Sequence, residues 1–149
     1  MRNWLGILAM FIVIGRCDFP LRNEDRVFNT IKNAASAVEK ENLTKISQLI
    51  TKNYYDSWGH NYKELLDFLQ GIFYRFDRID VKLVKNSITI SQDTKAICDL
   101  NVWVTLYDKY LNQPDAWQER ILVYLVRENN TWKISFVSKY SLRTEEPLV

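Results

Sequence analysis

The stretch that decides the fold of this chain is KAICDLNVWVTLY, residues 95–107. Apolar and polar residues alternate along it, and it is rich in Val, Ile, Trp and Thr, which is typical of a long β-strand. The same two-residue period predicts strands over residues 77–90, 116–127 and 132–140, with a turn or a bulge at Asn86-Ser87. The second half of the chain is therefore a run of consecutive strands, which favours an antiparallel sheet.

The residues before these strands have helical spacing instead. Apolar residues recur every three to four positions over 23–41 and, more briefly, over 42–53. A third helix is expected after Asn61, because Asn61 and Glu64 have the spacing of a capping box. Its broad apolar stripe, which suits packing on a sheet, consists of Leu65, Leu66, Leu69, Ile72, Phe73 and Phe76. The chain is predicted to be an α+β domain in which N-terminal helices pack on a curved antiparallel sheet.

Two short segments stand out within this order of elements. YYD at residues 54–56 precedes the third helix, and ENNTWKI at residues 128–134 leads into the last strand. Together with the element order, over roughly residues 24–140, they resemble the NTF2-like superfamily, the cone-shaped fold shared with ketosteroid isomerase and SnoaL-type cyclases. The resemblance implies a cavity between helices and sheet, dimerisation through the sheet, and either an enzyme or a protein without enzymatic activity. We place this domain at residues 23–142 and a C-terminal tail at residues 143–149.

The first residues indicate export. Arg2 is followed by an apolar run from Trp4 to Gly15 that is long enough for a signal peptide but too short to span a bilayer with ease. The run ends at Arg16 and Cys17, and it resembles a bacterial lipobox in which the cysteine receives the lipid. We predict a signal peptide at residues 1–16, lipid attachment at Cys17, a tether at residues 17–22 and a place in the bacterial cell envelope. A cleaved signal without lipid and an uncleaved short anchor are the alternatives.

Composition argues against several classes of partner. Without Arg2 and Arg16, the 20 basic residues fall to 18 against 18 acidic ones, and no run of Lys and Arg suggests nucleic-acid binding. Beyond the signal only Gly59 and Gly71 remain of the 4 glycines, too few for a phosphate-binding loop or a dinucleotide fingerprint. The chain has 1 His and 2 Cys without ligand spacing, so we predict neither a metal site nor a cofactor. Cys98 is expected to be a buried small hydrophobe.

The candidates for catalysis are Asp56 and His60, with Tyr54 and Tyr55 as hydrogen-bond donors. In the resembled superfamily a pocket Asp, or a His with an Asp, transfers protons beside a carbonyl group. The favoured interpretation is structural: Asp56 or Ser57 caps a helix, and His60 lies on an exposed loop that contains glycine.

Candidates for ligand or interface contact are mainly aromatic and uncharged polar residues. Several of them share one face of the strand at residues 95–107, a composition that is typical of an interface or a ligand cavity. The set consists of Tyr55, Trp58, Asp99, Asn101, Trp103 and Tyr107.

These observations support one leading hypothesis and two alternatives. The leading one is a non-enzymatic envelope lipoprotein that binds a partner protein or a small ligand through its cavity or its sheet face. The first alternative is a small-molecule isomerase, cyclase or dehydratase that uses Asp56 and His60. The second is a secretion-apparatus subunit, similar to the periplasmic NTF2-like domains of type IV systems.

Overall fold

The computed structural model describes residues 21–141. The predicted signal peptide, Cys17, most of the tether and the tail at 143–149 lie outside the described residues. Within the part that is described, no helix is long and apolar enough to cross a membrane.

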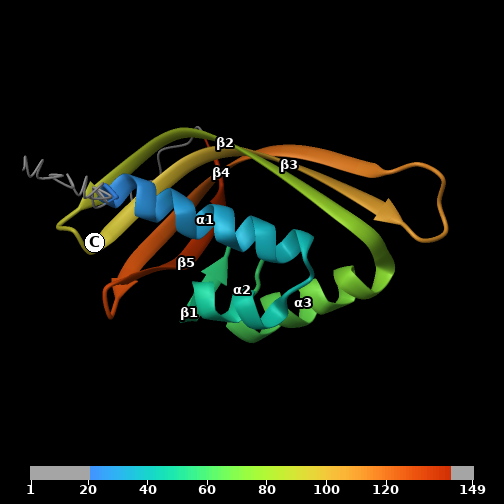
Figure 1. The fold of residues 1–149 in the computed structure, drawn as a ribbon, viewed down its shortest axis with the longest axis horizontal. Coiled ribbons are helices and arrows are strands. Elements are labelled where there is room, and N and C mark those ends of the chain that lie inside the picture. Colours follow the sequence, from blue (N-terminus) through green and yellow to red (C-terminus); the bar gives the residue numbers. More distant parts are fainter. Residues whose placement is uncertain (1–20, 142–149) are drawn as a thin grey trace, which may run out of the picture.

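Three helices and five strands make up the described fold. The helices are α1 (Asn23–Glu39), α2 (Leu43–Leu49) and α3 (Tyr62–Arg75). The strands are β1 (Ile50–Asp56), β2 (Phe76–Ser91), β3 (Lys95–Asp108), β4 (Asp115–Glu128) and β5 (Thr131–Lys139). They form one sheet in the order β1-β5-β4-β3-β2. Figure 1 shows the long strands arching over the helices, which all lie on the concave side of the sheet.

The predicted α+β class, with helices on a curved sheet, is confirmed. The strands from β2 to β5 pair antiparallel, as expected, and the register of β2 shifts between Lys85 and Ser87, so the predicted irregularity at Asn86-Ser87 is a bulge. The capping box that opens α3 is also present, because the Asn61 side chain accepts from the Glu64 backbone N–H and the Glu64 carboxylate accepts from the Asn61 backbone N–H.

One strand was missing from the prediction. The second helix was expected to continue to Asn53, but it ends at Leu49, and the chain then forms β1, which pairs parallel with β5. The sheet is consequently mixed. Ile50, Thr51, Tyr54 and Asp56 are buried, because β1 covers the edge of β5 and packs against the helices. Tertiary packing has overridden a weak local helical pattern here.

The core lies between α1 and the concave face of the sheet. Val27 and Ile31 of α1 pack against alternate residues of the strands, among them Leu100, Leu125 and Trp132. Cys98 belongs to this core, as predicted, and burial raises the pKa of its thiol to about 11. Since Leu100 and its alternate neighbours face the core, the residues between them on β3 face the outer side of the sheet.

Candidate functional site

The candidate site begins at the turn that joins β1 to α3. The backbone N–H of Asp56 donates to the carbonyl of His60 at 3.0 Å, and that of Gly59 donates to the carbonyl of Asp56 at 3.2 Å. Gly59 has a φ of 96°, in the region that L-residues avoid, so glycine is required for this turn. The short loop therefore has a defined shape and brings residues 56 and 60 together.

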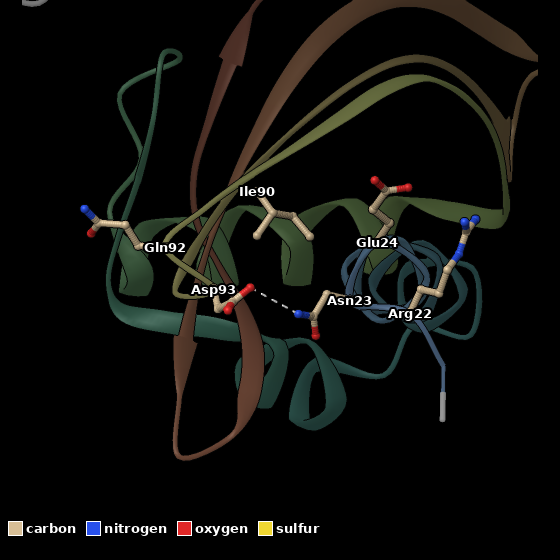
Figure 2. Close-up of a pocket in the computed structure, with 6 residues that line it drawn as sticks. All are labelled: Arg22, Asn23, Glu24, Ile90, Gln92 and Asp93. Atoms are coloured by element: carbon tan, nitrogen blue, oxygen red, sulfur yellow. Dashed lines mark hydrogen bonds between the residues drawn. The ribbon is translucent and has the colours of Figure 1, made fainter. Parts of the chain in front are cut away.

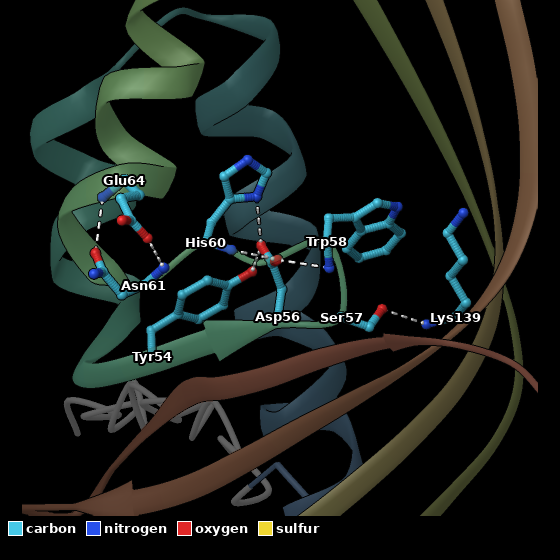
Figure 3. Close-up of polar contacts among 8 residues, drawn as sticks. All are labelled: Tyr54, Asp56, Ser57, Trp58, His60, Asn61, Glu64 and Lys139. Atoms are coloured by element: carbon cyan, nitrogen blue, oxygen red, sulfur yellow. Dashed lines mark hydrogen bonds and ion pairs between the residues drawn. The ribbon is translucent and has the colours of Figure 1, made fainter.

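The carboxylate of Asp56 is the centre of this turn. Its side chain is only 3% exposed. One oxygen, Oδ1, accepts from the backbone N–H groups of Trp58 and His60, each at 3.0 Å. The other, Oδ2, contacts the Tyr54 hydroxyl and His60 Nδ1, each also at 3.0 Å. Figure 3 shows the two side chains and the loop backbone converging on this group. Four contacts account for the usual capacity of a buried carboxylate.

Tyr54 is a donor in this cluster. Its burial, together with the neighbouring negative charge of Asp56 and their hydrogen bond, raises the pKa of the phenol well above its ordinary value. The hydroxyl therefore keeps its proton at any physiological pH and donates to the carboxylate.

His60 is oriented by the same carboxylate. An ionised carboxylate can only accept, so Nδ1 of His60 carries the proton of that contact, and the lone pair of the neutral ring is then on Nε2. The ring stacks on Phe68 of α3, with 4.9 Å between ring centroids, and its side chain is 27% exposed. A histidine held in this way can accept a proton at Nε2 from a molecule beside it.

These contacts correct the structural interpretation of Asp56 and His60. Neither Asp56 nor Ser57 caps a helix, because Asn61 caps α3; Ser57 Oγ accepts instead from the backbone N–H of Lys139. His60 does follow the exposed residues 57–59 of the loop that contains glycine, as predicted, but its own side chain is half-buried against Phe68 of α3. The difference follows from β1, whose alternation turns Tyr54 and Asp56 inward together.

A cavity of about 740 Å³ lies beside this cluster, between the start of α3 and β4. Its walls are mostly aromatic and aliphatic. Its polar lining residues come from two segments: Asp56 and His60 from the end of β1 and the turn, and Gln118 and Glu119 from β4. The residues that line it are Tyr54, Asp56, Trp58, His60, Leu65, Phe68, Trp117, Gln118 and Glu119.

Two of the predicted contact residues, Trp58 of the turn and Tyr55 of β1, lie on different sides of the sheet. Trp58 lines the cavity, as a ligand contact would. Tyr55 points to the outer face of the sheet, where its ring stacks on Phe136 at 4.3 Å and lines a second hollow of about 630 Å³.

The four predicted contact residues of β3 lie on the outer face, away from the cavity. Asp99 forms an ion pair with Arg120, with Nη2 and Oδ2 2.5 Å apart, and this hydrogen bond lowers the pKa of the Asp99 carboxyl. Asn101 donates to the side chain of Asn86. The Trp103 and Tyr107 rings lie under the cations of Lys82 and Arg78. All four therefore have partners on neighbouring strands.

The prediction overlooked several residues of the cavity. Glu119 and Phe68 carried no signal by themselves, although the alternation of β4 places Trp117, Glu119 and Ile121 on one face. Finding them needed the register of β4 and the position of α3, which brings Leu65 and Phe68 opposite that face.

A further hollow, of about 380 Å³, lies where α1 meets the β2–β3 turn. Figure 2 shows its polar lining and the contact between Asn23 Nδ2 and Asp93 Oδ1, 3.4 Å apart. The Asn23–Asp93 contact links α1 to the turn through exposed side chains, and the residues that line the hollow include no buried charged group. Over residues 21–141, no cluster of three or more metal-ligating side chains occurs either.

Comparisons with known proteins identify the fold. No family model and no curated protein matches the sequence. Among solved structures, a protein of Novosphingobium aromaticivorans named as a possible scytalone dehydratase superposes with a TM-score of 0.73 at 11% identity, covering 80% of this chain and 89% of that one. An NTF2-like superfamily protein of Salmonella enterica gives 0.68 at 14% identity, covering 85% and 97%.

A third neighbour is the hexachlorocyclohexane dehydrochlorinase LinA-type3 of Novosphingobium barchaimii, with a TM-score of 0.67 at 11% identity, covering 80% of this chain and 86% of that one. At such identities the likeness concerns the fold alone. The described domain has the NTF2-like fold.

Proposed function

We propose that this NTF2-like domain binds a small, largely apolar molecule in the cavity between α3 and β4. The observation that carries the proposal is the exposure of large rings around one hollow: Trp58, Phe68 and Trp117 are 42%, 49% and 44% exposed. Large side chains that remain half exposed around a concave site gain free energy when an apolar molecule covers them.

The state of the Asp56 carboxylate argues against Asp56 itself as a catalytic base. Both of its oxygens already have partners within the chain. Oδ1 accepts from two backbone N–H groups of the turn, and Oδ2 contacts Tyr54 and His60. A carboxylate used in this way holds the loop in place and is not available to take a proton from a substrate. Asp56 therefore acts as a positioning residue.

A second candidate function is supported by His60. With Nδ1 directed at Asp56 and Nε2 left for a proton, the pair has the geometry of an oriented general base at a cavity wall. Two of the structural neighbours bear the names of a dehydratase and a dehydrochlorinase, which supports a lyase or isomerase, although one fold hosts many functions. Its test concerns His60 and is set out in the Discussion.

Cavity binding is tested with 1-naphthalenemethanol, a neutral two-ring probe, by titration calorimetry. We expect Trp58→Ala to weaken its binding about tenfold, because the lost ring contact is worth roughly 1 to 2 kcal/mol. Trp103→Ala removes the same ring from the outer face and serves as the matched control. Equal affinity of the two variants, or no heat with the wild-type protein, would contradict binding in this cavity.

We further propose that the domain is tethered to the membrane of the cell envelope through lipid on Cys17. The proposal rests on the apolar run from Trp4 to Gly15 and on the cysteine that follows it. Mass spectrometry of the protein isolated from envelopes of a bacterial host is expected to show a chain that begins at a lipid-modified Cys17. Recovery of an intact Met1, or of an unmodified Cys17, would refute it.

A further inference from the structure

The charged side chains that line the cavity differ in sign from the cation beside it, Lys139, which pairs with Glu119. Two carboxylates, Asp56 and Glu119, are among the lining residues, whereas no Lys or Arg of residues 21–141 is. We infer that the cavity selects an organic cation, a protonated or quaternary amine on an aromatic or alicyclic body. This inference rests on the proposed function and names its ligand class.

Glu119 is the group that would recognise the ammonium. It stands on β4, lines the same cavity as His60, and its side chain is 27% exposed. Its only ion pair is with Lys139 of β5, whose Nζ lies 3.5 Å from Oε1, within the described residues. The Lys139 side chain is 56% exposed, so it can move into solvent and leave the carboxylate to a ligand.

The chain already places an ammonium group where the ligand would put one. Lys139 Nζ lies 5.6 Å from the centroid of the Trp58 ring as well as beside Glu119. Figure 3 shows this side chain next to the indole. A ligand ammonium entering the cavity meets the same two groups, a carboxylate and the face of an indole, and both attract a cation.

An anion finds no comparable partner. A carboxylate or sulfonate in the cavity would lose its hydration beside Glu119 and the negative faces of Trp58 and Trp117. Among the described residues, the cation beside these groups is Lys139, whose ammonium is already paired with Glu119. Neutral molecules would bind through ring contacts alone. The expected order of affinity is therefore cation, neutral molecule, anion.

The test compares three probes that share one ring system and differ in charge: 1-naphthylmethylammonium, 1-naphthalenemethanol and 1-naphthoate. In titration calorimetry of the wild-type protein at low ionic strength, we expect the cation to bind roughly five- to tenfold tighter than the alcohol, and naphthoate to bind most weakly. Glu119→Gln is expected to reduce the ratio of cation to alcohol affinity to about one.

Glu128→Gln is the matched control, because Glu128 pairs with Lys133 outside the cavity, with 3.8 Å between Oε2 and Nζ, and the substitution makes the same change of net charge. It is expected to keep the wild-type ratio. A cation that binds no tighter than the alcohol, or a ratio that Glu119→Gln leaves intact, would overturn the charge selection while cavity binding stands. If no probe binds, both proposals fail.

Discussion

Replacing Asp56 with alanine is expected to lower the free energy of unfolding by about 3–5 kcal/mol, the range found when one partner of a buried charged network is removed. The Tyr54 hydroxyl and the backbone N–H groups of Trp58 and His60 would all lose their acceptor inside the fold. Urea unfolding followed by circular dichroism measures the loss.

Two further variants test whether the loss of stability comes from the hydrogen bonds of Asp56 or would follow from removing any carboxylate. Asp56→Asn keeps an acceptor for the loop but turns an amide donor toward Tyr54 or His60, so a smaller loss of about 1–3 kcal/mol is expected. Asp67→Ala removes a carboxylate from an exposed ion pair with Lys63 and is expected to leave the free energy of unfolding nearly unchanged. If Asp56→Ala were no more harmful than Asp67→Ala, the carboxylate would not hold the turn.

The second large effect concerns proton transfer by His60. On the lyase or isomerase candidate, the wild-type protein is expected to accelerate exchange of the acidic α-protons of 2-tetralone, a two-ring ketone, in deuterated water. His60→Gln is expected to lower this rate by about 10²–10⁴-fold, the usual contribution of a positioned general base. Proton NMR of the ketone follows the exchange directly.

Added imidazole provides the control for this experiment. If Nε2 of His60 is the base, free imidazole entering the cavity of the glutamine variant should restore part of the exchange, whereas it should add only its solution rate to the wild-type reaction. Circular dichroism must show that His60→Gln is folded. Equal exchange rates for the two proteins would remove the enzymatic candidate and leave binding alone.

The prediction from sequence was most accurate where the periodicity was long and regular. The alternation over residues 95–107 and the capping box at Asn61 and Glu64 identified β3 and the start of α3, and the cysteine expected in the core is buried there. Each of these features depends on neighbours close in the chain, so local spacing contains the necessary information.

The prediction was least accurate where one segment depends on a distant one. Ile50–Asp56 is a strand because β5, which lies far along the sequence, offers a free edge to it. The turn that follows then brings Asp56 and His60 together, although no helix joins them. In the sequence their four-residue spacing suggested contact only if α3 began earlier than it does.

The sequence alone determined the order of the three helices and of the four strands β2 to β5, and the core face of β3, because each depends on local spacing. The export signal stays a prediction. Only the tertiary structure decided which polar residues share a cavity. Asp99, Asn101 and Trp103 lie on the outer face, whereas Glu119 of β4 lines the same cavity as Asp56. The register between strands and the position of α3 decide which residues line the cavity and which face outward. Both arise from contacts between residues far apart in the chain.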